Sequence, residues 1–206
     1  MKTQFHRAIT VKALSAYFMA EALETVVGSN LGQDALRYQF GHDHFHYDSN
    51  SFAAGDAYCD ELRHLVVVAL QKTEATQARE FLGGLTHTVQ DFYAHSNYVG
   101  LWREIYPGAT SDEIDPELPE IMKHPRLHSG KLYYPLEAFS FIKVLNPFVI
   151  PWLPRDSHAW MNIDDPSRPD FAFAFAAAVK RTGLEYLRIC EQLSPQEIAV
   201  LTGNSG

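Results

Sequence analysis

A histidine, an aspartate and a second histidine recur at intervals of four residues in the segment LTHTVQDFYAHSN, at His87, Asp91 and His95. If this segment is helical, side chains four residues apart share one face, so two imidazoles and a carboxylate point the same way. Nitrogen and oxygen ligands of this kind bind zinc and related metals. The same spacing also occurs in surface His–Asp pairs worth about 0.2–0.5 kcal/mol. The choice depends on whether other segments supply further ligands.

A second histidine-rich segment is GHDHFHYDSNSF, residues 41–52. It is polar, rich in turn formers and lies between predicted helices, so we expect a loop. His44, His46 and Asp48 alternate, and in an extended stretch they would point one way. The loop either contributes metal ligands or is an inert exposed segment.

Three further histidines lie in separate segments. His6 falls in the first turn of a predicted helix, where a histidine is commonly solvated or part of a cap. His64 lies beside the apolar run LVVVAL and is commonly a satisfied core residue at such a place. His158 belongs to a second polar loop, DSHAWMNIDDPSRP, residues 156–169.

Composition limits the classes of partner. The chain has 206 residues, is 46% apolar and carries a net charge of −8. It is therefore long enough to bury a core, and a broad basic face for duplex nucleic acid is not expected. No apolar run reaches the length of a membrane span, although peripheral membrane contact stays open.

The two cysteines, Cys59 and Cys190, are far apart in the sequence and form no metal-binding pair. We expect each to pack in a helix as a small apolar residue, and a disulfide between them is not required. The start of the chain lacks an apolar stretch of signal-peptide length, which predicts a cytoplasmic protein.

Apolar periodicity predicts an all-α protein made of one domain, 1–206. Long helices are expected at 5–26, 52–73, 76–102 (with a break after Asn97) and 168–192, and shorter ones at 33–40, 116–123, 135–145 and 195–201. A turn is expected at 28–32, and Gly83 and Gly84 would permit close approach of another helix. The predicted metal-binding core comprises 5–100 and 156–192, and 106–155 is an irregular, proline-rich insertion.

The segment LTHTVQDFYAHSNYV at 85–99 resembles the signature of the Het-C (heterokaryon incompatibility) family. That family belongs with the zinc-dependent phospholipases C and the fungal single-strand nucleases. FHRAIT, HFHYDS and HAWMNIDDPS resemble, in the expected order, its histidine-bearing first helix, its aspartate-bearing loop and its late ligand pair. The resemblance implies a single multi-helix domain of the phospholipase C type.

The resemblance also implies two or three zinc ions and the residues that hold them. One ion would be held by Asp48, His64, His87 and Asp91; Asp91 would bridge to an ion bound by His6; another would be held by His95 and His158, with Asn162 or Asp164 nearby and His46 in reserve. The sequence departs from the phospholipases in lacking their amino-terminal tryptophan ligand. It also has His95 four rather than six residues after Asp91, and Asn162 in place of a carboxylate.

The implied activity is hydrolysis of a phosphoester, with a small phosphoester or a phospholipid head group as substrate. Two zinc ions roughly 3.5–4 Å apart would activate water, and Asp48 and Asp91 would be the catalytic carboxylates. The rival expectation is a non-catalytic, Het-C-like helical protein that keeps a structural metal. A third is a helical interaction module whose histidines are incidental.

Overall fold

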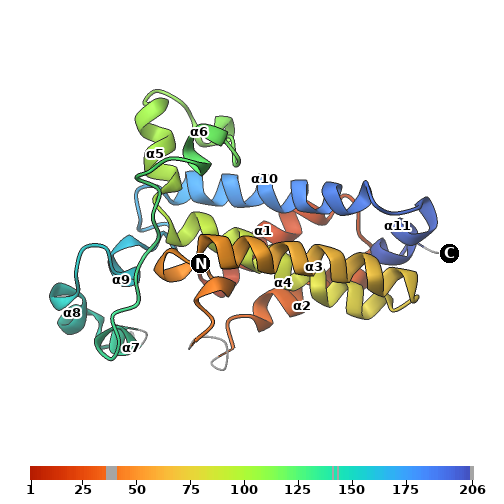
Figure 1. Cartoon of the computed structure of the whole chain (residues 1–206), viewed down its shortest axis with the longest axis horizontal. Coiled ribbons are helices and arrows are strands. Elements are labelled where there is room, and N and C mark those ends of the chain that lie inside the picture. Colours follow the sequence, from red (N-terminus) through yellow and green to blue (C-terminus); the bar gives the residue numbers. More distant parts are fainter. Residues whose placement is uncertain (36–40, 141, 143, 205–206) are drawn as a thin grey trace.

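One helix, α4 (Ala75–His95), lies at the centre of the molecule and is packed by the other long helices. In this computed structural model every residue from Leu82 to His95 is buried. A helix covered on all sides belongs to the core of a bundle rather than to its surface. The bundle around α4 is formed by α1 (Thr3–Leu14), α2 (Ala20–Gly32), α3 (Phe52–Gln71) and α10 (Phe171–Cys190). Figure 1 shows α10 along one side of the bundle and the amino terminus at the end opposite the carboxyl terminus.

The structure describes residues 1–35, 41–140, 142 and 144–204. Short helices complete this part of the chain: α5 (Tyr98–Ile105), α6 (Pro119–Met122), α7 (Leu136–Ser140), α8 (Asn146–Val149), α9 (His158–Met161) and α11 (Pro195–Thr202), with 3-10 turns η2 (Asp43–Phe45), η3 (Asp48–Asn50), η4 (Ser111–Glu113) and η5 (Ile150–Trp152). Within those ranges the only β structure is two isolated bridges, Ser96–Ser129 and Lys131–Ser157. The all-α prediction is confirmed.

The predicted helix at 5–26 is wrong, because the chain breaks between Leu14 and Ala20. The amide of Met19 donates to the carbonyl of Thr202 at 2.8 Å, so α11 captures a group that a continuous helix would use internally. The predicted turn at 28–32 is part of α2. Residues 33–35 form a turn, and the rest of the predicted helix 33–40 lies outside the described residues.

Other element predictions are confirmed. Residues 52–73 correspond to α3, and the predicted break after Asn97 separates α4 from α5. Ser194 caps α11 in a capping box with Glu197, as the Ser-Pro start indicates. A Cβ on Gly83 would lie 2.5 Å from the carbonyl oxygen of Val26, so this glycine is needed where α2 crosses α4.

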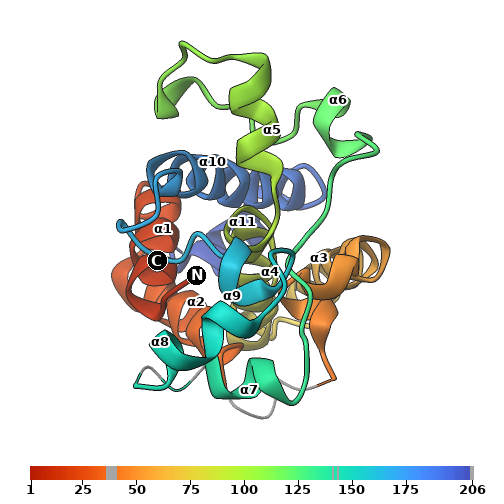
Figure 2. The same cartoon turned by 90° about the vertical axis from the view of Figure 1, so that its left-hand side faces the viewer.

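The segment between α4 and α10 gathers at one end of the bundle. Figure 2 looks onto that end, with α9 in front of α4 beside the amino terminus, and α7 and α8 at the lower edge. The end of α4 that carries Asp91 and His95 is therefore covered by loops and short helices, not by a long helix. No helix among the described residues has the length and apolar character that crossing a membrane requires.

Candidate metal centre

The motif on α4 does place its three polar side chains at one end of the bundle. His87 and Asp91 are fully buried, and His95 is 6% exposed. His87 Nε2 lies 3.0 Å from Asp91 Oδ2, and His95 Nε2 lies 3.7 Å from Asp91 Oδ1. The spacing of four residues thus aligns these groups as predicted.

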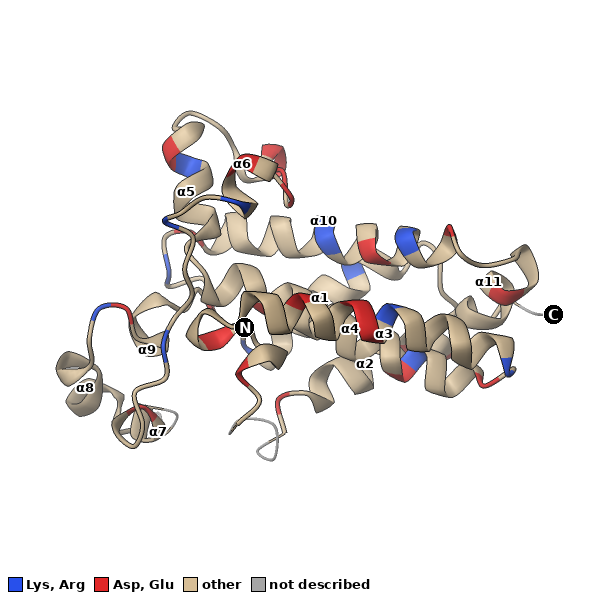
Figure 3. Cartoon of the chain, in the orientation of Figure 1, with Lys and Arg blue, Asp and Glu red and all other residues tan. Residues whose placement is uncertain are grey.

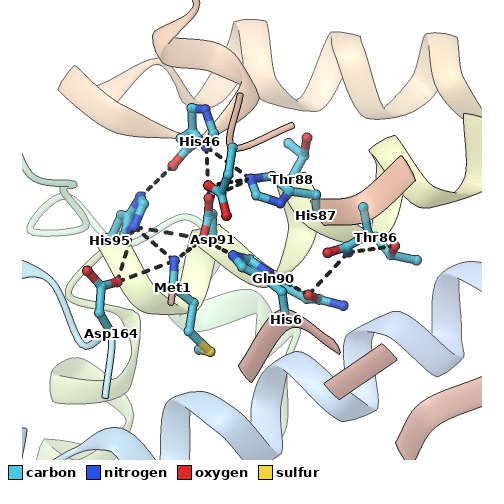
Figure 4. Close-up of polar contacts among 12 residues, drawn as sticks. Met1, His6, His46, Thr86, His87, Thr88, Gln90, Asp91, His95 and Asp164 are labelled. Atoms are coloured by element: carbon cyan, nitrogen blue, oxygen red, sulfur yellow. Dashed lines mark hydrogen bonds and ion pairs between the residues drawn. The ribbon is translucent and has the colours of Figure 1, made fainter. Parts of the chain in front are cut away.

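Asp91 is surrounded by histidine nitrogens from three elements (Figure 4). Besides His87, its Oδ2 is approached by His46 Nδ1 at 2.9 Å, and its Oδ1 by His6 Nε2 at 3.1 Å. The two nitrogens of His46 and His87 are themselves 3.1 Å apart. Nitrogen ligands of a tetrahedral zinc ion, each about 2.0–2.1 Å from the metal, lie roughly 3.3 Å from one another. The separations in this group are close to that value.

The ring of His6 is oriented by a hydrogen bond on its far side. Its Nδ1 lies 2.7 Å from Gln90 Oε1, and Gln90 Nε2 donates to Thr10 Oγ1 and Thr182 Oγ1. Because the amide oxygen can only accept, His6 Nδ1 carries a proton. In the neutral ring, Nε2 then presents a lone pair to the Asp91 carboxylate. Two acceptors facing each other at 3.1 Å require a proton or a metal ion between them.

The loop that brings His46 and Asp48 inward has an unusual backbone. Tyr47, Ser49 and Asn50 all have positive φ, at 56°, 55° and 59°. Such angles are uncommon for residues other than glycine and require support from the surroundings. The support comes from a neighbouring strand-like segment: Ser49 N donates to the carbonyl of Gly130, and Asn50 N to Ser129 Oγ, both at 2.8 Å.

A second group of ligand atoms is formed by Asp48, His95 and His158. Asp48 Oδ1 lies 2.9 Å from His158 Nδ1 and 3.3 Å from His95 Nδ1. Gly130 makes this arrangement fit, since a Cβ there would be 2.6 Å from the Cα of His158. The amide of Gly130 also donates to the carbonyl of His95 at 2.9 Å. One short segment therefore ties the end of α4, the loop at 46–50 and the start of α9 together.

Further charged groups surround the two histidine groups. Asp34 Oδ1 lies 3.8 Å from His87 Nε2, and Asp34 forms a third set of ligand atoms with His6 and His87. The amino group of Met1 is buried against Asp91 and lies 3.3 Å from both Asp164 Oδ1 and His95 Nε2. Four carboxylates (Asp34, Asp48, Asp91 and Asp164) thus converge on this end of the bundle.

Burial and charge shift the pKa values of these groups in different directions. Burial lowers the pKa of His87 to about 4 and also lowers that of His6. Burial opposes ionisation of Asp91, but the Met1 amine and His95 outweigh it and lower its pKa. Burial would lower the pKa of His95, but the negative charges of Asp91 and Asp48 raise it. Burial would also lower the pKa of the Met1 amine, but Asp164 and Asp91 raise it to about 11. Asp91 is therefore ionised and His6 and His87 are neutral, which is the state of these three groups that binds a metal ion, whereas His95 would have to release its proton on binding.

The structure does not bring every predicted residue to this centre. His64 is exposed and belongs to none of the three groups. It follows the buried Leu62 by two residues, about 200° around α3, and so points away from the core. Asn162 is turned elsewhere: its Nδ2 donates to the carbonyl of Ala159, and its Oδ1 accepts from Arg168. Both cysteines are free, and Cys59 is buried as predicted.

Several residues at this centre are not predicted as primary ligands by the sequence. His46 was only a reserve ligand, although it lies against Asp91. Asp34 carries no local pattern that marks it. The segment 128–131 has no pattern of ligand residues, because it contacts the end of α4, the loop at 46–50 and the start of α9 through backbone hydrogen bonds.

The fold and the site define an all-α domain with a buried histidine–aspartate cluster at one end of its bundle. A family model described as the VWA7 N-terminal domain matches residues 1–110, which is more than half of the sequence. The chain therefore belongs to the VWA7 N-terminal domain family.

Curated relatives agree with this assignment. Von Willebrand factor A domain-containing protein 7 of Rattus norvegicus is 35% identical over 80 residues, and that of Homo sapiens is 36% identical over 80 residues. Each match covers 39% of this chain but only 9% of the relative. No solved structure matches the chain significantly.

The family match corrects the resemblance drawn from the sequence. The assignment to the Het-C family is wrong, and so is the function derived from it, a zinc-dependent, phospholipase C-like hydrolase of phosphoesters. Metal-competent residues spaced four apart on a helix recur in unrelated proteins, so the short motif at 85–99 does not specify one family. The type of helical fold shared by the phospholipases C stays a prediction. The catalytic roles expected of Asp48 and Asp91 depended on the hydrolase and are not retained.

Proposed function

We propose that this domain binds two divalent metal ions, with zinc the best fit, and uses them to hold one end of its helical bundle together. The first ion would lie among His46, His87 and Asp91, with His6 and Asp34 beside it. The second would lie among Asp48, His95 and His158. The observation that carries the proposal is that both oxygens of the buried Asp91 carboxylate face histidine nitrogens from separate elements at 2.9–3.1 Å.

The donor set favours zinc among the divalent ions. Imidazole nitrogens and carboxylate oxygens suit zinc, whereas magnesium and calcium prefer oxygen alone. Outer hydrogen bonds fix ligand rings, as that of His6 Nδ1 to Gln90 Oε1 illustrates. Negative charge from four carboxylates favours a bound cation.

The proposed role is structural. The ligands come from the first helix, from the turn after α2, from the loop at 46–50, from α4 and from α9. An ion held between these elements would stabilise the folded state relative to the unfolded chain, in which no such site exists. The strained loop at 46–50 is the segment that depends most on this stabilisation, because its positive φ angles are otherwise unfavourable.

Elemental analysis of the purified chain tests the proposal. We expect about two zinc ions per chain after dialysis, and about one in Asp48→Asn, because only the second group loses its carboxylate. Asp60→Asn is the matched control, since Asp60 is an exposed aspartate on α3. A chain that binds less than one ion after incubation with zinc, and whose Tm is unchanged by a chelator, would contradict the proposal.

A further inference from the structure

A lobe formed by the described residues 134–140, 142 and 144–153, which contains α7, α8 and η5, carries the most exposed large apolar side chains of the described chain. Val144 and Phe148 are each 73% exposed, and Trp152 is 81% exposed. Phe139 and Ile142, in the same lobe, are about half exposed. In Figure 1 this lobe projects from the end of the bundle that carries the amino terminus. Exposed apolar side chains gathered in one place indicate an interaction surface.

The exposed side chains of the lobe do not pack against the bundle. A cavity of about 640 Å³ lies between the lobe and the bundle, lined on the lobe side by Ser140, Asn146 and Ile150. Its bundle side is polar and includes Asp164, Asp165 and Arg168. Contact with that wall would place apolar groups against charged ones, which costs free energy. The facing wall therefore offers these apolar side chains little apolar surface that could cover them.

The charge pattern of the lobe differs from that of the rest of the protein. From Ala138 to Pro154 the sequence has no acidic residue and one basic residue, Lys143, although the whole chain carries −8. Figure 3 shows the ribbon of α8 without charge. The sequence continues after the lobe with Arg155, whose guanidinium stacks on Trp160 at 3.8 Å, and Asp156, which pairs with Lys131. Glu137 is the acidic residue at the start of α7, and it is buried with Oε1 accepting from the amide of Ala159.

We propose that this lobe inserts shallowly into the surface of a lipid bilayer. Tryptophan and phenylalanine favour the boundary between head groups and acyl chains, and basic residues beside them interact with lipid phosphates. The lobe is a protruding tip, so it fits a fluid partner that closes around it. Absence of acidic residues avoids repulsion from anionic head groups. Because no described helix can cross a membrane, the contact is peripheral.

Co-sedimentation of the full chain with phosphatidylcholine vesicles, with and without phosphatidylserine, tests the proposal. Val144→Ser combined with Phe148→Ser should lower the partition coefficient at least about tenfold, since burial of each side chain is worth more than 1 kcal/mol. The control is Ile105→Ser combined with Tyr106→Ser, which alters exposed apolar side chains (42% each) at the end of α5. Partition of the control should equal that of the unaltered chain.

Tryptophan fluorescence provides a second readout. Of the three tryptophans, Trp102 is 3% exposed, Trp160 is half-buried and Trp152 is 81% exposed, so vesicles should shift the emission of Trp152 to shorter wavelength and brominated acyl chains should quench it. Trp152→Phe should abolish the shift and retain partition. Equal loss of partition in lobe and control variants, or no shift and no partition, would overturn the proposal. So would concentration-dependent self-association without vesicle binding that the lobe variant abolishes, because the face would then bind a second copy. Zinc content measured in each variant tests the metal proposal separately, because loss of vesicle binding with unchanged zinc content concerns the lobe alone.

Discussion

Two buried clusters of charged residues lie in the bundle, and they neutralise their carboxylates differently. In the first, defined here as the Asp91 cluster (Asp91 with His6, His46, His87 and the Met1 amine), the carboxylate faces mainly imidazoles. In the second, the Glu185 cluster, a fully buried carboxylate faces three guanidinium groups. Arg181 Nε and Arg188 Nη1 donate to Glu185 Oε1 at 2.6 and 2.8 Å, and Arg63 Nε lies 3.2 Å from Oε2.

The difference lies in where the positive charge comes from. Arginine is always protonated, and although burial opposes it, Tyr93, Glu185 and Glu117 raise the pKa of Arg181 further. The Glu185 cluster is therefore complete with the side chains that the sequence provides. Histidine exists in a neutral form that binds metals, and burial keeps His87 in that form. The difference is that the Glu185 cluster is neutralised by permanently charged arginines, whereas the Asp91 cluster contains neutral imidazoles that have the chemistry of metal ligands.

The largest expected effect is loss of metal-dependent stability in Asp91→Asn. At a free zinc concentration a thousand times the Kd, binding stabilises the folded chain by about 4 kcal/mol. Replacing the carboxylate that faces three histidines should abolish most of this difference. Thermal unfolding with zinc and with a chelator measures it. If zinc stabilises Asp91→Asn as much as the unaltered chain, the cluster is not the binding site.

A slightly smaller effect is expected from Glu185→Gln. The substitution leaves Arg63, Arg181 and Arg188 without their central carboxylate, although Glu117 still pairs with two of them. Breaking one partner of a buried ion pair costs about 3 kcal/mol. Denaturant unfolding should show this loss equally with zinc and with a chelator. A loss that appears only with zinc present would show that the two clusters are coupled.

Acid should destabilise the metal-free chain through the Asp91 cluster. The pKa of His87 is lowered from its usual 6.5 to about 4 in the folded state, so between these values the unfolded chain binds more protons. The free energy of unfolding should therefore fall as pH falls from 6.5 to 4, by on the order of 2–3 kcal/mol at 1.36 kcal/mol per unit.

His95 does not offset this change. Its raised pKa contributes stability that is fully present below about 6.5 and is lost only at higher pH. Because arginine side chains stay protonated in proteins, Glu185→Gln should keep the same slope of stability against pH between 6.5 and 4. Chevron or equilibrium denaturation at several pH values measures it, and a flat profile in the chelated chain would contradict the assignment.

The smallest effect is expected from His64→Ala. This side chain is exposed on α3 and outside both clusters, so the free energy of unfolding should change by less than about 0.5 kcal/mol. Zinc content should equal that of the unaltered chain. Loss of one ion in this variant would show that His64 is a ligand and would contradict its placement outside both clusters.

Sequence reasoning identified the helix at the centre of the site but not all of its surroundings. His87, Asp91 and His95 share one helix, so local periodicity suffices to align them. The choice between His46 and His64 depends on how a loop with three positive φ angles folds and on which face of α3 is buried, and neither follows from spacing. The break between α1 and α2 was missed because it depends on α11, more than 180 residues later. Backbone contacts of Gly130 leave no pattern of side-chain types at all.

The ligands of the Asp91 cluster and its neighbours lie far apart along the chain, from His6 near the start to His158 after the proline-rich segment. Contacts of such long range close large loops, which makes them slow to form and late in folding. During that interval His42, His44 and His46, which lie two residues apart in the sequence, would be the first histidines available together to the proposed ion. Under the proposed metal function, ion added before folding would therefore compete between these neighbouring histidines and the long-range site, whereas ion added after folding would meet only the completed site.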